Sequence, residues 1–242
     1  MIIMEKIISM FPIITENPEL AAKYAVFAVV GIVFVLFAVC LYIANKKEKE
    51  RIFALRQRAE ERGLMFEEKT EIPAKAGDGV FFTKGHSYTR KAANKTVSVK
   101  AGHHSFDVFD YCYVTGSGKS RQVHQYACAF SELRKSSGKF YPIFCLEPEN
   151  LFHKIADKFT HSDVDFEYYP HFSKIYYLTG PSKERIESFF KPAMLSCLES
   201  HPGLEIYSDG ENMTICRKGH LNPEEMANFE AEAEEIIQLF AM

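Results

Sequence analysis

The sequence predicts an α+β protein with one N-terminal transmembrane helix, a cytoplasmic antiparallel β-rich module and a mixed α/β C-terminal module. Three observations predict this. A run of 21 residues near the N-terminus holds no charged side chain. Short segments rich in Val, Phe, Tyr and Thr follow, separated by glycine-containing breaks. The last third mixes helix-like and strand-like periodicity and ends in a long amphipathic segment.

Composition narrows the class of protein. The 242 residues have room for one medium domain or two small ones, and a hydrophobic fraction of 47% supplies a core. The net charge of -3 argues against a nucleic-acid binder, which would show a strongly basic face. The six cysteines lie far apart without a C-x-x-C pair, which favours free thiols in a reducing compartment over a disulfide scaffold.

The uncharged run, residues 24–44, predicts a membrane-spanning helix. At about 1.5 Å per residue it reaches about 30 Å, the thickness of the hydrocarbon core. Two alternatives are weaker: a buried helix would need more protein around it, and the apolar region of a signal peptide is shorter. We divide the chain into an apolar or interfacial segment 1–23, a transmembrane helix 24–44, a basic membrane-proximal helix 45–63, a β-rich module 64–147 and an α+β module 148–242.

The flanking charges predict the orientation of this helix. Residues 1–23 hold two Lys or Arg and residues 45–62 hold seven, which places the C-terminal part in the cytoplasm and the N-terminus outside the cell membrane. The basic residues either contact anionic lipid head groups or form a solvated collar that only sets the topology. The candidates for lipid contact are Lys46, Lys47, Lys49 and Arg51.

Five segments of the β-rich module have the composition of strands. They are residues 64–68, 80–84, 96–100, 105–115 and 121–133, with a turn at 73–79.

The α+β module is predicted to contain three helices and two pairs of strands. Asn150, Ser182 and Asn222 begin the helices; the second is kinked at Pro192, and the third has Pro223 at its first position. The strands are residues 164–169 with 172–180, and 204–208 with 212–218 around Asp209-Gly210. We expect the acidic residues of the last helix to form a solvated face: Glu224, Glu225, Glu230, Glu232, Glu234 and Glu235.

Residues 116–120, Gly-Ser-Gly-Lys-Ser, resemble a nucleotide-binding loop. The full motif needs a glycine at position 113, where the chain has Tyr113, and it must join a strand to a helix. Strand-like sequence lies on both sides, so we predict a β-hairpin turn and neither nucleotide nor cofactor.

The same hairpin supplies the candidate site residues. A hydrolase or metal-dependent enzyme would use the nearby acids and histidines: His103, His104, Asp107, Asp110 and His124. Asp107 and Asp110 fall on opposite faces of a strand, so spacing does not bring the group to one point. We therefore assign no catalytic or metal-binding residue and favour a partner-binding set: Lys119, Arg121, His124, Asp110, Tyr111 and Tyr113.

Two motifs carry a family resemblance. Residues 106–130 fit the pattern F-D-Y-x-Y-x-T-G-x-G-K followed by basic residues and a histidine, and residues 164–180 fit D-F-x-x-x-P-x-F-S-x-x-Y-x-L-x-G. The sequence resembles an uncharacterised family of bacterial single-pass membrane-anchored proteins over residues 52–240. This resemblance implies fold kinship and membrane association and transfers no catalytic residue. The expectation is a membrane-tethered interaction or scaffold module that binds a protein or lipid partner.

Overall fold

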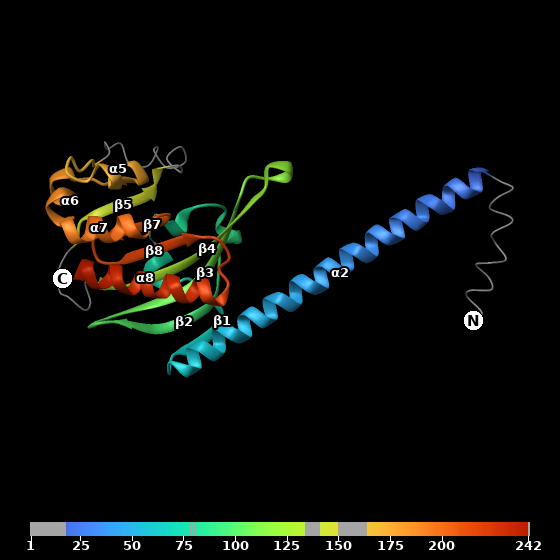
Figure 1. Ribbon diagram of the computed structural model, residues 1–242, viewed down its shortest axis with the longest axis horizontal. Coiled ribbons are helices and arrows are strands. Elements are labelled where there is room, and N and C mark those ends of the chain that lie inside the picture. The colour runs from blue at the N-terminus through green and yellow to red at the C-terminus, as the bar shows by residue number, and fades with distance from the viewer. Residues whose placement is uncertain (1–17, 78, 80, 134–140, 150–163, 242) are drawn as a thin grey trace. The chain divides into compact units, whose positions relative to one another are not determined.

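The computed structural model describes residues 18–77, 79, 81–133, 141–149 and 164–241. The chain divides into two compact units with the boundary after Arg51. The first unit holds most of helix α2 (Pro18–Glu61), and the second contains a sheet with its covering helices (Figure 1).

Helix α2 is long and apolar enough to cross a membrane. Its large apolar side chains are exposed, for example Phe27 and Phe34 at 72% each. An apolar stretch of this length needs cover, and a bilayer supplies it without specific contacts. The helix is therefore compatible with the predicted membrane anchor. Of the four basic residues expected at lipid head groups, Arg51 is 8% exposed and pairs with Glu48, while the three lysines are exposed.

The second unit is built on one eight-stranded antiparallel sheet with the order β1-β2-β3-β4-β8-β7-β5-β6. The strands are β1 (Met65–Thr70), β2 (Lys91–Ala101), β3 (His104–Thr115), β4 (Gln122–Ser131), β5 (Ile143–Pro148), β6 (Tyr176–Thr179), β7 (Leu204–Asp209) and β8 (Met213–Lys218). The boundary expected between residues 147 and 148 falls inside β5, and both predicted modules contribute strands to this sheet. The α+β class is confirmed.

Helices cover one face of the sheet. They are α5 (Pro170–Ile175), α6 (Lys183–Phe189), α7 (Pro192–Ser200) and α8 (Pro223–Ala241), and α8 crosses in front of the strands in Figure 1. The core beneath them includes Phe144, Ile206 and Phe229, each at most 2% exposed. The last turns of α2 join this core through Leu55, and Gly63 ends the helix with a φ of 67°.

Helix α8 begins where the sequence predicts. The side-chain oxygen of Asn222 accepts hydrogen bonds from the backbone N–H groups of Glu224 and Glu225 at 2.9 Å, and the Glu225 carboxylate accepts one from the backbone N–H of Asn222. The prediction that the acidic residues of α8 form a solvated face is wrong in part. Glu230 is 6% exposed and pairs with Arg58 and Arg62, because the end of α2 packs beside α8.

Two predicted strands are wrong. Residues 81–83 form a 3₁₀ helix, η1 (Phe81–Thr83), because both phenylalanines are buried and a strand would point them to opposite faces. Residues 164–169 form no strand, and their turn is closed by the N–H of Tyr169 donating to the carbonyl of Phe166. The predicted strand 172–180 is helix α5 up to Ile175 and strand β6 after it. The helix predicted from Asn150 lies outside the described residues.

Candidate functional site

The sheet face opposite the helices is covered by a short segment, residues 81–90, which we call the strap. It contains η1 and a second 3₁₀ helix, η2 (Ser87–Thr89). Phe81 packs edge-on against Tyr126 with 5.0 Å between ring centroids, and Phe82 packs against Tyr111 at 4.9 Å. Arg90 holds the strap together by donating hydrogen bonds to three of its backbone carbonyls.

Gly85 brings the strap close to strand β3. A Cβ at this position would lie 2.5 Å from Cδ2 of Tyr113 and 2.8 Å from the carbonyl oxygen of Val114, and its φ is +71°. Only glycine fits both the contact and the left-handed backbone. The next residue, His86, then donates its backbone N–H to Val114 at 3.0 Å.

Lys84 extends from the strap into a buried charged cluster with Glu147, Glu205 and Tyr207 of the sheet. The Nζ atom of Lys84 lies 3.2 Å from an oxygen of each glutamate and donates to the Tyr207 hydroxyl at 2.7 Å. The Tyr207 hydroxyl lies within hydrogen-bond distance of both glutamates, and it donates its single proton to one of them at a time. The lysine also lies 4.8 Å above the ring centre of Phe81.

The protonation of this cluster follows from burial and charge. Burial opposes the charged form of Lys84, but the carboxylates of Glu205 and Glu147 outweigh it and raise the pKa of the ammonium. Burial raises the pKa of Glu147, against the opposing effect of Lys84. Burial also raises the pKa of Tyr207 well above its usual value. Lys84 is therefore a cation and Tyr207 a hydrogen-bond donor, so neither is prepared to act as a nucleophile.

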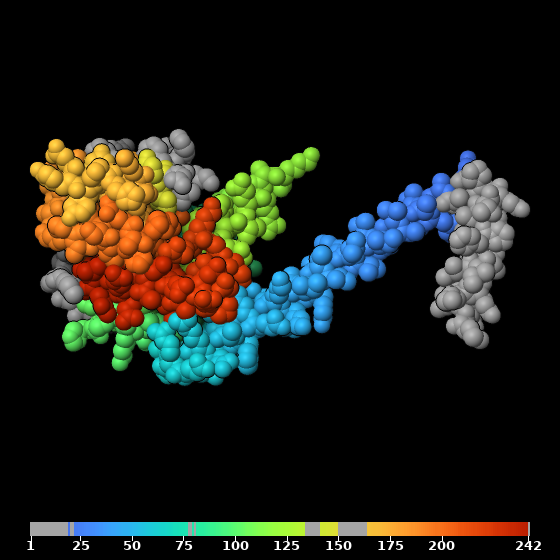
Figure 2. Space-filling model, viewed as in Figure 1, coloured from blue at the N-terminus to red at the C-terminus, as the bar shows by residue number. Residues whose placement is uncertain are grey.

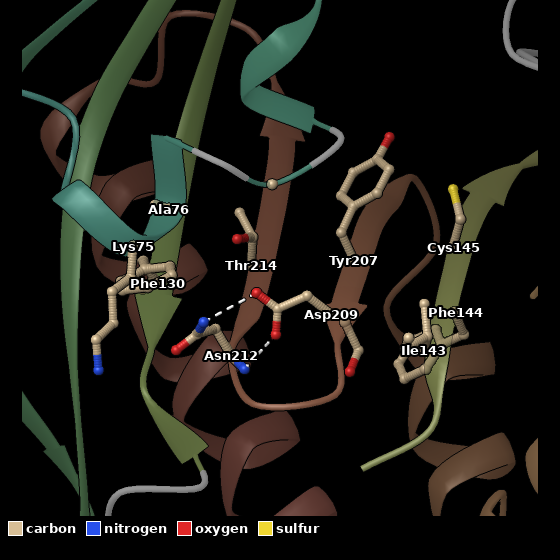
Figure 3. A pocket seen from close by; sticks show the side chains of 12 residues that line it. Lys75, Ala76, Phe130, Ile143, Phe144, Cys145, Tyr207, Asp209, Asn212 and Thr214 are labelled. Atoms are coloured by element: carbon tan, nitrogen blue, oxygen red, sulfur yellow. Dashed lines mark hydrogen bonds between the residues drawn. The ribbon is translucent and has the colours of Figure 1, made fainter. Parts of the chain in front are cut away.

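A small pocket opens beside the cluster (Figure 3), with Tyr207 in its wall. Strands β4, β5, β7 and β8 form the pocket with α3 (Ala74–Gly77). Asp209 is occupied by the turn after β7, where it accepts hydrogen bonds from the backbone of Glu211 and from Asn212. The volume of about 130 Å³ is below the roughly 300–1,000 Å³ of pockets that enclose drug-sized ligands, so the pocket admits only a small group.

The β3–β4 hairpin stands out from the second unit (Figures 1 and 2), and its tip is a turn, as the sequence predicts. Residues 118–120 form a 3₁₀ helix, η3 (Gly118–Ser120), between two strands. The backbone carbonyl of Ser117 accepts a hydrogen bond from the Ser120 hydroxyl at 2.8 Å. This strand–turn–strand arrangement lacks the long helix whose N-terminus holds phosphate in a nucleotide-binding loop.

The structure separates the predicted partner-binding residues. Lys119 and Arg121 are exposed at the hairpin tip. Tyr111 and Tyr113 are 1% and 5% exposed, so they belong to the interior and not to a recognition surface. His124 is half-buried, stacks on Tyr113 at 4.7 Å and bonds to the Thr115 hydroxyl.

The two aspartates of β3 contact irregular positions in β2. Asp110 accepts a hydrogen bond from the side chain of Asn94, and Asp107 accepts one from the backbone N–H of Ser98. Asn94 and Ser98 have φ values of 51° and 66°, and each falls at a register shift between β2 and β3. Both aspartates therefore stabilise β-bulges.

The five acids and histidines of the hairpin do not converge. His104 begins β3 and pairs with Ala101, whereas His124 pairs with Tyr113 near the other end of that strand. The nine steps along the strand from His104 to Tyr113 span roughly 30 Å at about 3.3 Å per residue. This distance cannot be bridged by one ion or one small substrate.

Sequence reasoning missed the cluster under the strap. One signal was present: Glu147 follows the apolar run 143–146, and Glu205 lies between Leu204 and Ile206. An acid among such apolar neighbours in a strand needs a buried partner. The sequence did not identify Lys84 as that partner, because it is 63 residues from Glu147 and 121 residues from Glu205.

Comparison with known proteins gives a fold and no family. No protein-family model matches the chain, and no curated protein matches it significantly. The fold is similar to that in the crystal structure of the mycobacterial trehalose monomycolate transport factor A, TtfA, with a TM-score of 0.52. The similarity covers 78% of this chain and 95% of that one at 9% sequence identity. At this identity the likeness concerns the fold alone.

Proposed function

We propose that this chain is a membrane-tethered module that binds an anionic partner through the tip of the β3–β4 hairpin. In this proposal α2 spans the cell membrane with its N-terminus outside, and the second unit lies in the cytoplasm. The excess of Lys and Arg on the C-terminal side of the apolar run supports this orientation.

One observation carries the binding proposal: the tip is a protruding, cationic and acid-free surface. β2 pairs with β3 only as far as Cys112, and β8 pairs with β4 only from Tyr126, so the end of the hairpin has no neighbouring strand. All residues from 116 to 123 are exposed. No Asp or Glu occurs between Tyr111 and Ser131, so the charges of Lys119 and Arg121 are not offset within the hairpin.

The tip also offers apolar contact area. Val123 is 57% exposed beside the two cations, and Tyr88 is 80% exposed. Tyr88 stacks on His86, whose side chain bonds to the carbonyl of Gly116 at the base of the tip. A protein partner combines such aromatic and cationic contacts, and anionic lipid head groups use the cations alone.

The similar fold of the mycobacterial transport factor supports a membrane-associated or lipid-related role in general terms. The resemblance to bacterial single-pass membrane proteins supports the same tethered arrangement. Neither names the partner.

A charge-reversal experiment tests the proposal. The full chain with Lys119→Glu and Arg121→Glu is solubilised from membranes, and co-purifying proteins and lipids are quantified by mass spectrometry. The matched control reverses two exposed cations elsewhere, Lys174→Glu and Arg185→Glu. We expect the tip variant to lose at least tenfold of a protein or an anionic lipid that wild type and control retain.

The molecule that the tip variant no longer retains shows whether the anionic partner is a protein or a lipid. Loss of a protein identifies a protein partner, and loss of anionic phospholipid with unchanged proteins identifies head groups. Identical retention by all three chains contradicts the proposal.

A further inference from the structure

A second cluster of polar side chains lies on the helical side of the second unit, away from the strap. It joins the end of α7 to α8 and consists of Cys197, His201 and Glu235. Cys197 lies in the last turn of α7, and His201 is the residue that directly follows the helix. Glu235 reaches them from α8, which packs against α7.

The three side chains have the spacing of metal ligands. One ligand atom from each lies within 4.8 Å of the other two. Glu235 faces both partners: Oε1 is 3.5 Å from Sγ of Cys197, and Oε2 is 3.2 Å from Nε2 of His201. A tetrahedral zinc ion with Zn–S of about 2.3 Å and Zn–N or Zn–O of about 2.0–2.1 Å would separate its ligand atoms by about 3.3–3.5 Å.

A further carboxylate and an arginine lie behind the histidine. The Nδ1 atom of His201 lies 3.8 Å from Oε1 of Glu232, and the other oxygen of Glu232 bonds to Arg217 at 2.5 Å. In metal sites the histidine nitrogen that does not bind the ion commonly faces a carboxylate, which fixes the ring orientation. Arg217 and Glu232 would hold His201 with Nε2 directed at Glu235.

The environment admits an ion from solvent. Cys197 is 8% exposed, while the Glu235 side chain is 56% exposed, so one side of the cluster is sheltered and the other is open. Three protein ligands with one open position are typical of zinc sites that bind water or an exogenous ligand. Thiolate, imidazole and carboxylate together favour zinc over magnesium or calcium, which prefer oxygen ligands.

We propose that Cys197, His201 and Glu235 bind one zinc ion between α7 and α8, with Glu232 as a positioning residue. The site lies outside the hairpin residues considered for metal binding from the sequence. It is independent of the proposed partner surface, so either can fail without the other.

Cobalt substitution tests the site directly. The full chain in detergent is stripped of metal with a chelator and titrated with Co²⁺, and Zn²⁺ binding is then measured by competition. We expect one ion per chain, with visible absorption of tetrahedral cobalt and thiolate-to-cobalt charge transfer in the near ultraviolet. Cys197→Ser should abolish the charge-transfer band, and Glu232→Gln should weaken Zn²⁺ binding about 10- to 100-fold while retaining the band.

Two controls keep the result interpretable. Cys112→Ser and His171→Gln remove a thiol and an imidazole elsewhere and should leave both spectrum and affinity unchanged. Glu235→Gln alters the most exposed ligand, so the fold should survive, as circular dichroism will show, while Zn²⁺ binding weakens at least tenfold. A cobalt spectrum without charge transfer, or equal affinity in wild type and Glu235→Gln, overturns the proposal.

Discussion

Replacing Lys84 by methionine should destabilise the second unit more than any exposed lysine substitution. The change keeps most of the aliphatic stem and removes the charge that lies between Glu147 and Glu205. Those carboxylate side chains are 5% and 2% exposed, and Lys84 itself is 16% exposed. Removing one partner of a buried ion pair costs about 3–5 kcal/mol, because the remaining charge is left without a partner.

Urea denaturation of the full chain in detergent, followed by tyrosine fluorescence, measures this cost, since the chain has no tryptophan. With an m value of about 2 kcal/mol/M, the midpoint should fall by roughly 2 M. Lys75→Met is the matched control, because Lys75 also bonds a glutamate, at 2.8 Å, but its side chain is 57% exposed. The control should cost at most about 1 kcal/mol.

The stability lost in Lys84→Met should also depend on pH. The folded-state pKa of Glu147 is raised above its ordinary value, so its contribution favours folding at low pH and is lost as the pH rises through the folded pKa. Removing Lys84 removes the charge that opposes this rise, so the folded pKa moves higher still. The free energy of unfolding that Lys84→Met loses relative to wild type should therefore be smaller at pH 5 than at pH 7. Equal midpoints for the Lys84 and Lys75 variants, or a deficit that is larger at pH 5, would refute the reasoning.

Three further predictions concern the hairpin tip, the last helix and the buried thiols. Gly116→Ala places a Cβ 2.3 Å from a backbone oxygen at a φ of +70°, so backbone hydrogen exchange at the hairpin tip should speed up at least tenfold. Gly118→Ala is the control: its Cβ has free space, so exchange should change less, and equal effects of the two substitutions would be contrary evidence. Asn222→Ala should cost about 1 kcal/mol and lower Tm by about 2–4 °C, and an unchanged Tm would argue against the cap. Burial raises the pKa values of the Cys128 and Cys216 thiols, so maleimide should label them only after unfolding; rapid labelling of the folded chain would contradict their burial.

The sequence correctly predicted the elements that depend on residues close together in the chain, such as the start of α8 and the β3–β4 turn. The start of α8 follows from the cap at Asn222 and the proline after it, and both lie within four residues of the contacts they make. The β3–β4 turn follows from Gly116 and Gly118, which adopt φ values of 70° and 52°. The fold class was therefore predictable from sequence.

The arrangement under the strap was not predictable, because it depends on contacts distant in sequence. Residues 80–84 have strand composition, yet Phe81 and Phe82 are both 1% exposed and face the same sheet. This placement requires a local helical turn, which tertiary packing imposes against β propensity. The joining of two expected modules into one sheet likewise depends on β4 pairing with β8, 88 residues apart at Cys128 and Cys216.

The sequence correctly indicated that Lys119 and Arg121 are exposed, but it grouped them with Tyr111 and Tyr113, which are buried. Alternation correctly put Asp107 and Asp110 on opposite faces of β3, and it did not reveal that each contacts a bulge in β2. Those bulges have no sequence signal beyond Asn94, whose residue type tolerates a positive φ.

Site-specific photo-crosslinking in native membranes tests the central proposal most directly. A photoreactive phenylalanine replaces Val123 at the hairpin tip. The control chain carries it at Tyr168, which is 89% exposed in the turn before α5. We predict a discrete protein or lipid adduct from position 123 that disappears when Lys119→Glu and Arg121→Glu are added. No adduct from position 123, or one that survives both charge reversals, would contradict partner binding at the tip.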